Sequence, residues 1–185
     1  MTFEPIAGTL VIGLGHRARH GKDSVAQFMI EAAPADVMRF AFADALYDYC
    51  RIEHGMTTKD GPLLQRVGVE MRGRDPLVWV RAVYYKILEK KPKVAVLTDV
   101  RFPNEADFVR QMNGYTVRVQ RSHPDGVLYQ ANDRDPFHIS EIALTDDRHW
   151  YLTIHNYQGL DELRRKAEFA LDYLWRKGAD DVRTR

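Results

Sequence analysis

The stretch TLVIGLGHRARHGKDSVA, residues 9–26, decides the fold. Its first part, residues 9–14, is a short apolar and β-branched run that predicts a buried strand. The apolar residues that follow have helical spacing and predict a helix over residues 22–33. A glycine-containing loop between a strand and a helix can bind phosphate through backbone N–H groups, and its usual pattern is G-x-x-x-x-G-K-[ST]. Here His16 replaces the first glycine and Asp23 follows the lysine, but the context favours a phosphate loop over an ordinary turn.

The rest of the chain alternates short apolar runs, which predict strands, with longer segments of helical periodicity. We expect strands over residues 36–42, 93–99, 115–121 and 150–156. We expect helices over residues 43–55, 62–72, 75–91, 103–112 and 159–178, the third with Asp75 as N-cap and Pro76 as its first residue, and a frayed tail over 180–185. This alternation predicts an α/β fold with a doubly wound, five-stranded parallel sheet. Ligands bind such sheets beyond the carboxyl ends of the strands.

Composition narrows the classes of partner. The 185 residues suggest one domain, and 27 Lys and Arg against 26 Asp and Glu give a formal net charge of +1. A general nucleic-acid or membrane-surface role usually needs a stronger basic excess, so we expect neither partner. Cys50 is the only cysteine, which excludes an intrachain disulfide and fits a reducing cytoplasm. Because there is neither a membrane-length apolar run nor a basic leader, we expect a cytoplasmic protein.

The loop carries the first set of chemical expectations. Lys22 would reach the β- and γ-phosphates of ATP. Asp23 would hold Mg²⁺ or act beside the acceptor, unless it only favours the helix dipole. We expect Gly15 to supply the tight turn, leaving His16 to face the phosphates or solvent. The loop residues expected to bind ATP are Gly15, His16, Arg17, Ala18, Arg19, His20, Gly21, Lys22, Asp23 and Ser24.

The second chemical signal is VAVLTDVRFPNEADF, residues 94–108. Asp99 ends a buried apolar run, which is the place of the acid that orients Mg²⁺ and its waters in P-loop enzymes, although many such acids only cap loops. Arg101 is suited to bind a phosphate or carboxylate with two hydrogen bonds, and the alternative is a salt bridge with Glu105. The helix-rich segment between this strand and the lysine-bearing loop strengthens the assignment.

Several motifs in order resemble those of the phage-type deoxynucleoside monophosphate kinases. They are RARHGKDS (17–24), FADAL (42–46), LLQRVGVEMRGRDPLVWV (63–80), TDVRFPNEA (98–106) and HISEIAL (138–144). The resemblance covers nearly the whole chain, and the ordered combination is more specific than any motif alone. The chain is similar, more distantly, to animal-type phosphomevalonate kinases. The main departure from the pattern is His16 at the first glycine of the loop.

This resemblance implies how the chain is divided. It implies a P-loop NTPase fold and a single kinase domain over residues 1–185, with a core (8–42, 93–121 and 150–178), a helical acceptor-binding excursion (43–92) and a short lid (122–137). Arg121 at the base of the lid would contact ATP, with Arg134 as a second phosphate contact, and closure would exclude water. Asn156 would lie near the adenine, unless it is only a turn former.

The resemblance also implies an acceptor site. Its expected residues are Asp44, Gln65, Arg66, Glu70, Arg72, Trp79, Asp99, Arg101, Ser140 and Glu141. The residues alone leave alternatives open. The helix over 62–72 has the pattern of a solvated charged face, Trp79 has that of a core residue, and Ser140 with Glu141 has that of a short helix start.

Together these features predict ATP-dependent phosphoryl transfer to a (deoxy)nucleoside monophosphate, giving the diphosphate and ADP. Lys22, Asp23 and Arg121 would be catalytic, and Asp23 with Asp99 would hold Mg²⁺ as the second cofactor beside ATP. The expected partners are the nucleoside monophosphate and, as an option, a second copy in a homodimer. The alternatives are another small-molecule P-loop kinase, of phosphomevalonate or dephospho-coenzyme-A type, and a non-catalytic nucleotide-binding protein.

Overall fold

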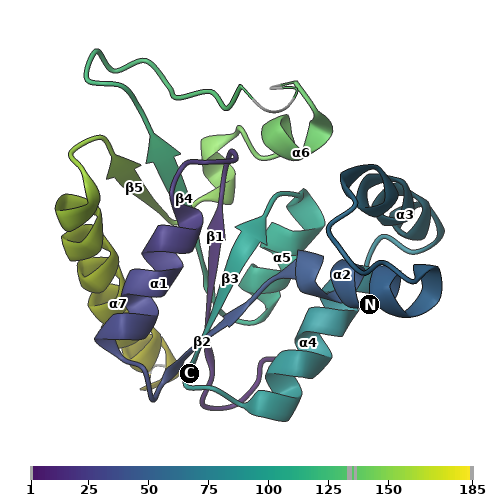
Figure 1. Ribbon diagram of the computed structural model, residues 1–185. Coiled ribbons are helices and arrows are strands. Elements are labelled where there is room, and N and C mark those ends of the chain that lie inside the picture. Colours follow the sequence, from purple (N-terminus) through teal and green to yellow (C-terminus); the bar gives the residue numbers. More distant parts are fainter. Residues whose placement is uncertain (1, 133–134, 136, 184–185) are drawn as a thin grey trace.

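The computed structural model describes residues 2–132, 135 and 137–183, and its centre is a five-stranded sheet (Figure 1). The strands are β1 (Leu10–Gly15), β2 (Val37–Phe40), β3 (Val94–Val100), β4 (Tyr115–Arg121) and β5 (Leu152–Asn156). Their order across the sheet is β2-β3-β1-β4-β5, and every neighbouring pair is parallel. The predicted α/β fold with a doubly wound, five-stranded parallel sheet is confirmed.

Helices cover both faces of this sheet. They are α1 (Lys22–Ala32), α2 (Phe42–His54), α3 (Gly61–Arg74), α4 (Val78–Lys90), α5 (Pro103–Gln111), α6 (Ile139–Ile142) and α7 (Leu160–Arg183), with a 3₁₀ turn at Asp147–His149. α1 packs beside α7 on one face, and α4 and α5 lie on the other (Figure 1). α6 lies beyond the carboxyl ends of the strands, at the top of the view. Within the described ranges, no helix combines the length and apolar character that crossing a membrane requires.

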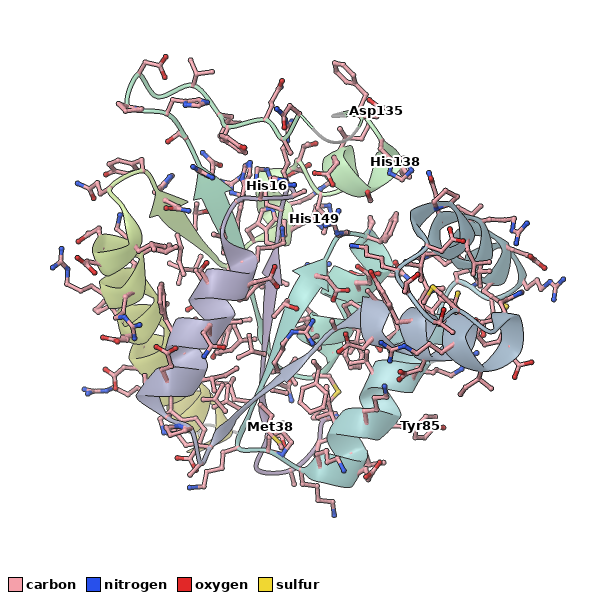
Figure 2. The ribbon with its side chains drawn as sticks, in the orientation of Figure 1. His16, Met38, Tyr85, Asp135, His138 and His149 are labelled. Carbon is pink, nitrogen blue, oxygen red and sulfur yellow. The ribbon has the colours of Figure 1, made fainter. Side chains whose placement is uncertain are left out.

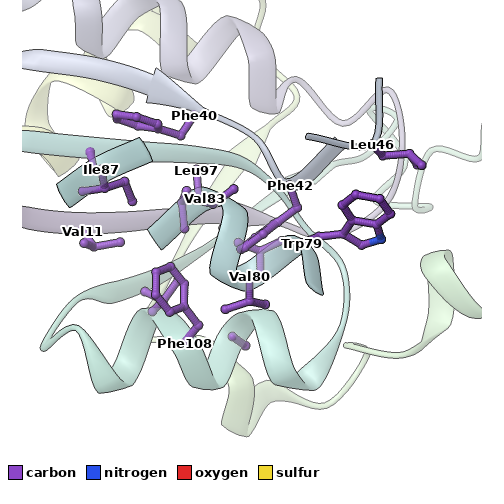
Figure 3. Close-up of a cluster of buried hydrophobic side chains, with 14 of the residues drawn as sticks. Val11, Phe40, Phe42, Leu46, Trp79, Val80, Val83, Ile87, Leu97 and Phe108 are labelled. Atoms are coloured by element: carbon purple, nitrogen blue, oxygen red, sulfur yellow. The ribbon is translucent and has the colours of Figure 1, made fainter. Parts of the chain in front are cut away.

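The core forms two layers because successive strand residues point to opposite faces of a sheet. Val11 and Leu97 pack with Phe108 on the face of α4 and α5 (Figure 3). Ile12 and Val96 belong to the cluster on the face of α1 and α7. All five side chains are fully buried. The two layers fix the strands and thereby the positions of the loops at their carboxyl ends.

The boundary between β2 and α2 differs from the prediction. The strand ends at Phe40 rather than at residue 42. The N–H groups of Phe42 and Ala43 donate instead to the carboxylate of Asp99, at 2.9 and 2.8 Å. These two bonds satisfy donors that a helix N-terminus leaves free, so the chain turns into α2 at this point.

Two helix boundaries also differ. α4 begins at Val78, so Asp75 is not its N-cap; Asp75 ends α3 and accepts a hydrogen bond from the N–H of Leu77 at 3.0 Å. The pre-proline residue disfavours helical geometry, which separates the two helices. α7 continues to Arg183 rather than ending at residue 178, so the segment predicted to be frayed is helical as far as it is described.

Candidate functional site

The turn after β1 is built differently from the prediction. Gly15 is the last residue of β1, and a Cβ atom there would lie 2.3 Å from the Trp150 ring and 2.5 Å from the carbonyl oxygen of Val100. Glycine is therefore needed for close packing, and the turn begins at His16, whose φ is 92°. The prediction that Gly15 makes the turn is wrong. His16 itself adopts the positive φ that the glycine of the usual pattern would adopt without strain.

The side chain of His16 faces neither a ligand cavity nor solvent. It is buried at the carboxyl end of the sheet (Figure 2), where its Nδ1 lies 3.3 Å from Nδ1 of His20 and its ring meets Trp150 edge to face. Burial lowers the pKa of His16 to about 3 and also lowers the pKa of His20. His16 is therefore neutral at pH 7 and packs behind the loop, which corrects the prediction for its side chain.

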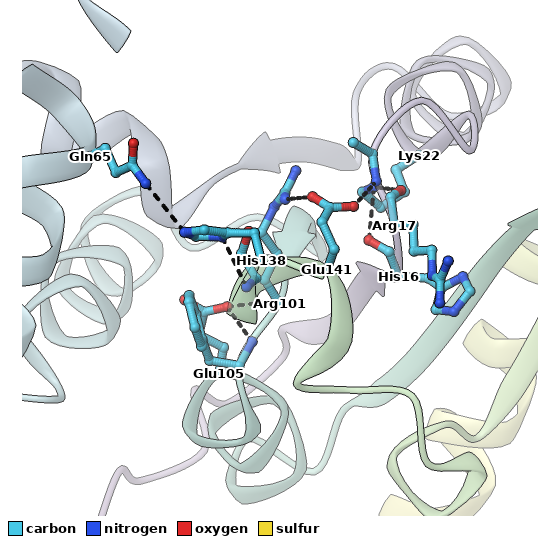
Figure 4. A network of polar contacts seen from close by, with 11 residues as sticks. His16, Arg17, Lys22, Gln65, Arg101, Glu105, His138 and Glu141 are labelled. Atoms are coloured by element: carbon cyan, nitrogen blue, oxygen red, sulfur yellow. Dashed lines mark hydrogen bonds and ion pairs between the residues drawn. The ribbon is translucent and has the colours of Figure 1, made fainter. Parts of the chain in front are cut away.

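Lys22 begins α1, and its side chain folds back over the loop (Figure 4). Its Nζ donates to the carbonyl oxygens of His16 at 3.1 Å and Arg17 at 2.6 Å. Burial, followed by the nearby charge of Arg101, lowers the pKa of Lys22 to about 8. A phosphate placed beside this ammonium would favour its charged form. The loop therefore holds a buried cation whose charge its surroundings only partly compensate.

Side chains from two distant segments hold the loop in place. Asn156, at the end of β5, donates from Nδ2 to the carbonyl oxygen of His20 at 3.0 Å. Glu141, in α6, accepts from the N–H of Ala18 at 2.8 Å and forms a salt bridge with Arg101 at 2.6 Å (Figure 4). The HISEIAL segment is thus joined to both the phosphate loop and the end of β3.

The alternative considered for Arg101, a salt bridge with Glu105, is not what the structure shows. The guanidinium bonds to Glu141, whereas Glu105 accepts from the backbone N–H groups of Arg101 and Phe102, at 2.7 and 3.1 Å. Burial and the nearby Asp99 raise the pKa of Glu105 to about 8. Glu105 therefore stabilises the turn into α5 through backbone N–H groups. It does not bind the guanidinium of Arg101, which remains available to the site.

Two cavities open beside the loop. The β5 cavity, of about 550 Å³, is lined by Arg19, Gly21, Lys22, Asp23, Ser24, Arg121, Ser122, His123, Pro124, Asn156, Tyr157, Gly159, Leu160 and Leu163. The α2 cavity, of about 910 Å³, is lined by Ala18, Arg19, Lys22, Asp23, Arg39, Ala41, Ala43, Asp44, Tyr47, Asp48, Arg51, Lys59, Lys86, Thr98, Asp99 and Arg101. Arg19, Lys22 and Asp23 line both. Ligands in the two cavities would meet at these three residues.

The α2 cavity has an excess of positive charge. Seven of its lining residues are Lys or Arg and four are Asp. Two of the acids pair with basic neighbours: Asp44 with Arg39 and Asp48 with Lys86, each at 2.9 Å. A cavity lined mainly by one sign of charge concentrates ligands of the opposite sign. The α2 cavity is therefore suited to an anionic ligand.

The two acids predicted to hold Mg²⁺ lie in different surroundings. Asp23 is exposed in the first turn of α1 and lines both cavities. Asp99 lines the α2 cavity but also caps α2, and burial raises its pKa against the effect of its two N–H donors. In the described part of the chain, no group of three or more His, Cys, Asp or Glu could hold a metal. Mg²⁺ would therefore need phosphate and water oxygens besides a carboxylate, which is its usual mode of binding.

The structure brings together most of the residues predicted to bind ATP. Those that line the β5 cavity are Arg19, Gly21, Lys22, Asp23, Ser24, Arg121 and Asn156. Ala18 lines the α2 cavity, whereas Gly15, His16, Arg17 and His20 line neither of the two. Arg134, the predicted second phosphate contact, lies outside the described residues.

The predicted acceptor residues divide into two groups. Asp44, Asp99 and Arg101 line the α2 cavity. The α3 residues Gln65, Arg66 and Glu70 instead line a shallow depression of about 530 Å³ on α3 itself, and their place in the acceptor site stays a prediction. The physical reason is the packing of α3 on α2, where Gly68 lies against Leu46. Side chains of α2 therefore form the cavity wall that the sequence assigns to α3.

Of the other acceptor predictions, the one for Trp79 is corrected, whereas the one for Arg72 stays a prediction. Trp79 is 4% exposed and packs in the hydrophobic core with Tyr49, so its predicted place in the acceptor site is wrong and its alternative, the core, is right (Figure 3). Arg72 lies over the ring of Phe102 at 4.7 Å and lines neither cavity. This contact joins α3 to the turn after β3.

Ser140 has a local role in α6. Its N–H donates to Nδ1 of His138, the N-cap of the helix, at 3.3 Å, which agrees with the predicted short helix. Nε2 of the same histidine lies 3.3 Å from Nε2 of Gln65 (Figure 4). Ser140 lines neither cavity. Two residues close to it connect α6 with its surroundings: His138 contacts Gln65 of α3, and Glu141 accepts from Ala18 in the phosphate loop.

Sequence reasoning missed several residues of the site. Arg39, Tyr47 and Lys86 line the α2 cavity but stand in no motif. Arg39 lies near the carboxyl end of β2, which is a signal that could have found it. Lys86 offers none, because only the packing of α4 against α2 brings it to the cavity.

No protein-family model matches the chain. Among curated proteins, 83 residues are 30% identical to a protein of Acanthamoeba polyphaga mimivirus provisionally named deoxynucleotide monophosphate kinase, a match over 44% of this chain and 39% of that protein. Another 54-residue match, at 43% identity, is to the deoxynucleoside-5'-monophosphate kinase of Escherichia phage T5, over 28% of this chain and 21% of that enzyme. The matches thus span less than half the length of either relative.

Among solved structures, a gluconokinase from Sinorhizobium meliloti 1021 has a TM-score of 0.54 to this chain at 18% identity, over 92% of this chain and 95% of that one. At this identity the similarity concerns the fold alone. The chain therefore shares its fold with that gluconokinase, and the predicted resemblance to deoxynucleoside monophosphate kinases is confirmed.

Proposed function

We propose that the protein transfers the γ-phosphoryl group of ATP to a (deoxy)nucleoside monophosphate, giving the diphosphate and ADP. The observation that carries the proposal is the meeting of two cavities at Arg19, Lys22 and Asp23. Transfer of a phosphoryl group from ATP to a monophosphate requires the two phosphate-bearing ligands to lie in line at a site of fixed positive charge. The relatives named as deoxynucleoside monophosphate kinases support a nucleotide as acceptor.

The β5 cavity would hold ATP. Its polar end contains the N-terminus of α1 with Lys22, where backbone N–H groups and the ammonium would bind the phosphates. Tyr157 and Leu160 also line this cavity and would offer an aromatic and apolar wall to the adenine. Arg121 lies at the rim and would contact the transferring group. In this proposal, the lid that excludes water from the site is the segment 122–137, of which residues 133, 134 and 136 lie outside the described part of the chain.

The α2 cavity would hold the acceptor. Its monophosphate would lie near Arg19, Lys22 and Arg101, where the cavity meets the donor site. Arg101 is held in place by its salt bridge to Glu141, so its guanidinium is positioned before any ligand binds. Tyr47, on the α2 wall, offers a ring against which the sugar or base would pack.

The chemistry needs no protein nucleophile. An oxygen of the acceptor phosphate attacks the γ-phosphorus, a new P–O bond forms, and the bond to the β,γ-bridging oxygen breaks, leaving ADP. Negative charge shifts toward that bridging oxygen, and Lys22 and Arg121 would stabilise it electrostatically. When bound, Mg²⁺ would neutralise phosphate charge, and Asp23 would hold it directly with Asp99 acting through waters.

An acceptor panel with ATP tests the proposal, with ADP release as the measurement. We expect turnover with one or more nucleoside monophosphates, and little with phosphomevalonate, dephospho-coenzyme A or gluconate. Turnover with one of the latter alone would replace the nucleotide acceptor by another small molecule. Nucleotide-dependent thermal stabilisation without any product would instead support a non-catalytic nucleotide-binding protein.

A further inference from the structure

His20 is fully buried between the phosphate loop and the segment that follows β4. The backbone N–H of Arg121 donates to its Nδ1 at 3.1 Å, and its Nε2 lies 2.9 Å from the carbonyl oxygen of Tyr129. An Nδ1 that accepts this bond carries no proton, so the proton is on Nε2 and is donated to Tyr129. A single neutral tautomer therefore satisfies both contacts. Through His20, the phosphate loop is bonded both to Arg121, the last residue of β4, and to Tyr129 in the segment that follows.

The segment from Arg121 to Tyr129 is a hairpin. Ser122 and Leu128 form an antiparallel bridge, and the N–H of Tyr129 donates to the carbonyl oxygen of Arg121 at 3.0 Å. The guanidinium of Arg121 lies over the Tyr129 ring, 4.3 Å from its centroid. A cation over an aromatic face is attracted to it, and the ring limits the directions that the long side chain can take.

We propose that His20 and Tyr129 are positioning residues for Arg121. His20 fixes the backbone of the arginine relative to the phosphate loop, and the Tyr129 ring aims its guanidinium along the rim of the β5 cavity. The inference rests on the proposed function, in which Arg121 contacts the transferring phosphoryl group. The usual phosphate-loop pattern has no requirement at the position of His20, so this role is specific to the contacts of this chain.

Two substitutions of His20 separate the contacts of its two ring nitrogens, of which Nδ1 also lies 3.3 Å from Nδ1 of His16. In His20→Asn, the amide oxygen stands as many bonds from Cα as Nδ1 does, so the acceptor for the Arg121 N–H is kept. In His20→Gln, the amide nitrogen stands where Nε2 does, so only the donor to Tyr129 is kept. We expect His20→Asn to retain kcat within about threefold and His20→Gln to lose about tenfold, with KM for the acceptor unchanged in both. Equal kcat in the two variants would overturn the role of the Arg121 bond.

Tyr129 gives a test in the exposed hairpin, where folding is less at risk. Tyr129→Phe keeps the ring and every contact described above, so kcat should stay within about twofold. Tyr129→Leu removes the ring and should lower kcat about tenfold. Phe169→Leu, at a 69% exposed position of α7 that lines neither cavity, is the matched control and should change nothing. A Tyr129→Leu enzyme with normal kcat would overturn the proposal.

Double variants with Arg121→Ala distinguish positioning from general damage. If His20 and Tyr129 act through Arg121, adding His20→Gln or Tyr129→Leu to Arg121→Ala should cost no further kcat. Full addition of the separate losses would contradict the inference. Should wild-type protein turn over no acceptor, the proposed function fails, but ATP and ADP affinities measured by calorimetry still test the positioning. Arg121→Ala, His20→Gln and Tyr129→Leu should then weaken ATP binding to a similar degree, and unequal losses would overturn the inference.

Discussion

The phosphate loop has two neighbouring walls that are built in different ways. On the β5 side, buried or partly buried groups hold the loop through hydrogen bonds of fixed geometry, such as Asn156 to the His20 carbonyl. On the α2 side, the wall carries ion pairs at the surface, and the side chains of Arg39 and Asp44 are 44% and 42% exposed. The β5 wall is therefore suited to hold ATP, a ligand common to many enzymes, in one fixed position. The α2 wall can change its side chains without disturbing the core, which suits the recognition of a particular acceptor.

Replacing Lys22, which both cavities share, should have the largest effect. Lys22→Met should lower phosphoryl transfer at least about a thousandfold, because a positioned cation at the transferring group is lost. The pKa of Lys22, about 8, lies below its ordinary value of 10.5, so at pH 7 the folded state carries the cost of a buried charge. Removing it should raise the free energy of unfolding by up to about 3 kcal/mol.

Lys93 provides the control for this substitution. It directly precedes β3, at the end of the strand away from Asp99 and the phosphate loop, and forms an exposed ion pair with Asp36 at 2.8 Å. Lys93→Met should leave ADP release unchanged. A Lys22→Met enzyme with near-normal ADP release would remove the proposed function, and one that is destabilised would show that the lysine's two hydrogen bonds outweigh its buried charge.

A substitution of Asp99 tests whether the α2 wall depends on the carboxylate that caps the N-terminus of α2. Asp99→Ala leaves the N–H groups of Phe42 and Ala43 without their acceptor, which should cost about 3 kcal/mol of unfolding free energy and raise KM for the acceptor. Asp60→Ala, at the exposed N-cap of α3, is the matched control and should cost about 1 kcal/mol. Urea unfolding and ADP release measure both. An Asp99→Ala protein of normal stability and low kcat would show that the carboxylate acts only on the metal and not as a cap of α2.

His16 should make the β5 side sensitive to acid. Its folded pKa of about 3 lies below the ordinary 6.5, so the stability it contributes is complete above about pH 6.5 and is lost as the pH falls toward 3. Between pH 7 and pH 5 the loss should be about 2 kcal/mol. His16→Asn, which tolerates a positive φ, should flatten this dependence in urea unfolding. A His16→Asn protein with the same slope as the wild type would contradict the explanation.

The contrast between the β5 wall and the α2 wall also explains which features could be predicted from the sequence. The β1 strand, the loop with Lys22 and the end of β3 were predictable because a buried apolar run followed by a polar motif is a local pattern. The conformation of His16 was not, because the close approach of Trp150 to Gly15 joins residues far apart in the sequence. The role of His20 was hidden for the same reason, since its bonds reach residues beyond β4.

The acceptor side was harder to predict. An amphipathic charged helix such as α3 does not reveal which of its faces borders a ligand, because that depends on how it packs against α2. Lys86 reaches the α2 cavity only through the packing of α4, and no periodicity in the sequence reports such a contact. Asp99 and Arg101 were predictable by position, but their partners in α2 and α6 were not.

The smallest effect is expected at Arg39. Its ion pair with Asp44 is exposed, so Arg39→Ala should leave the unfolding free energy unchanged within about 0.5 kcal/mol. Because the side chain lines the α2 cavity, KM for the acceptor should rise about threefold to tenfold while KM for ATP stays constant. The difference in KM for the acceptor between Arg39→Ala and the wild type should become smaller at high salt, since exposed charges are screened. Arg148→Ala, in an exposed pair with Asp146, is the control and should leave both constants unchanged. An equal rise in KM for ATP would show that Arg39 serves both ligands, and the separation of the two walls would then fail at this residue.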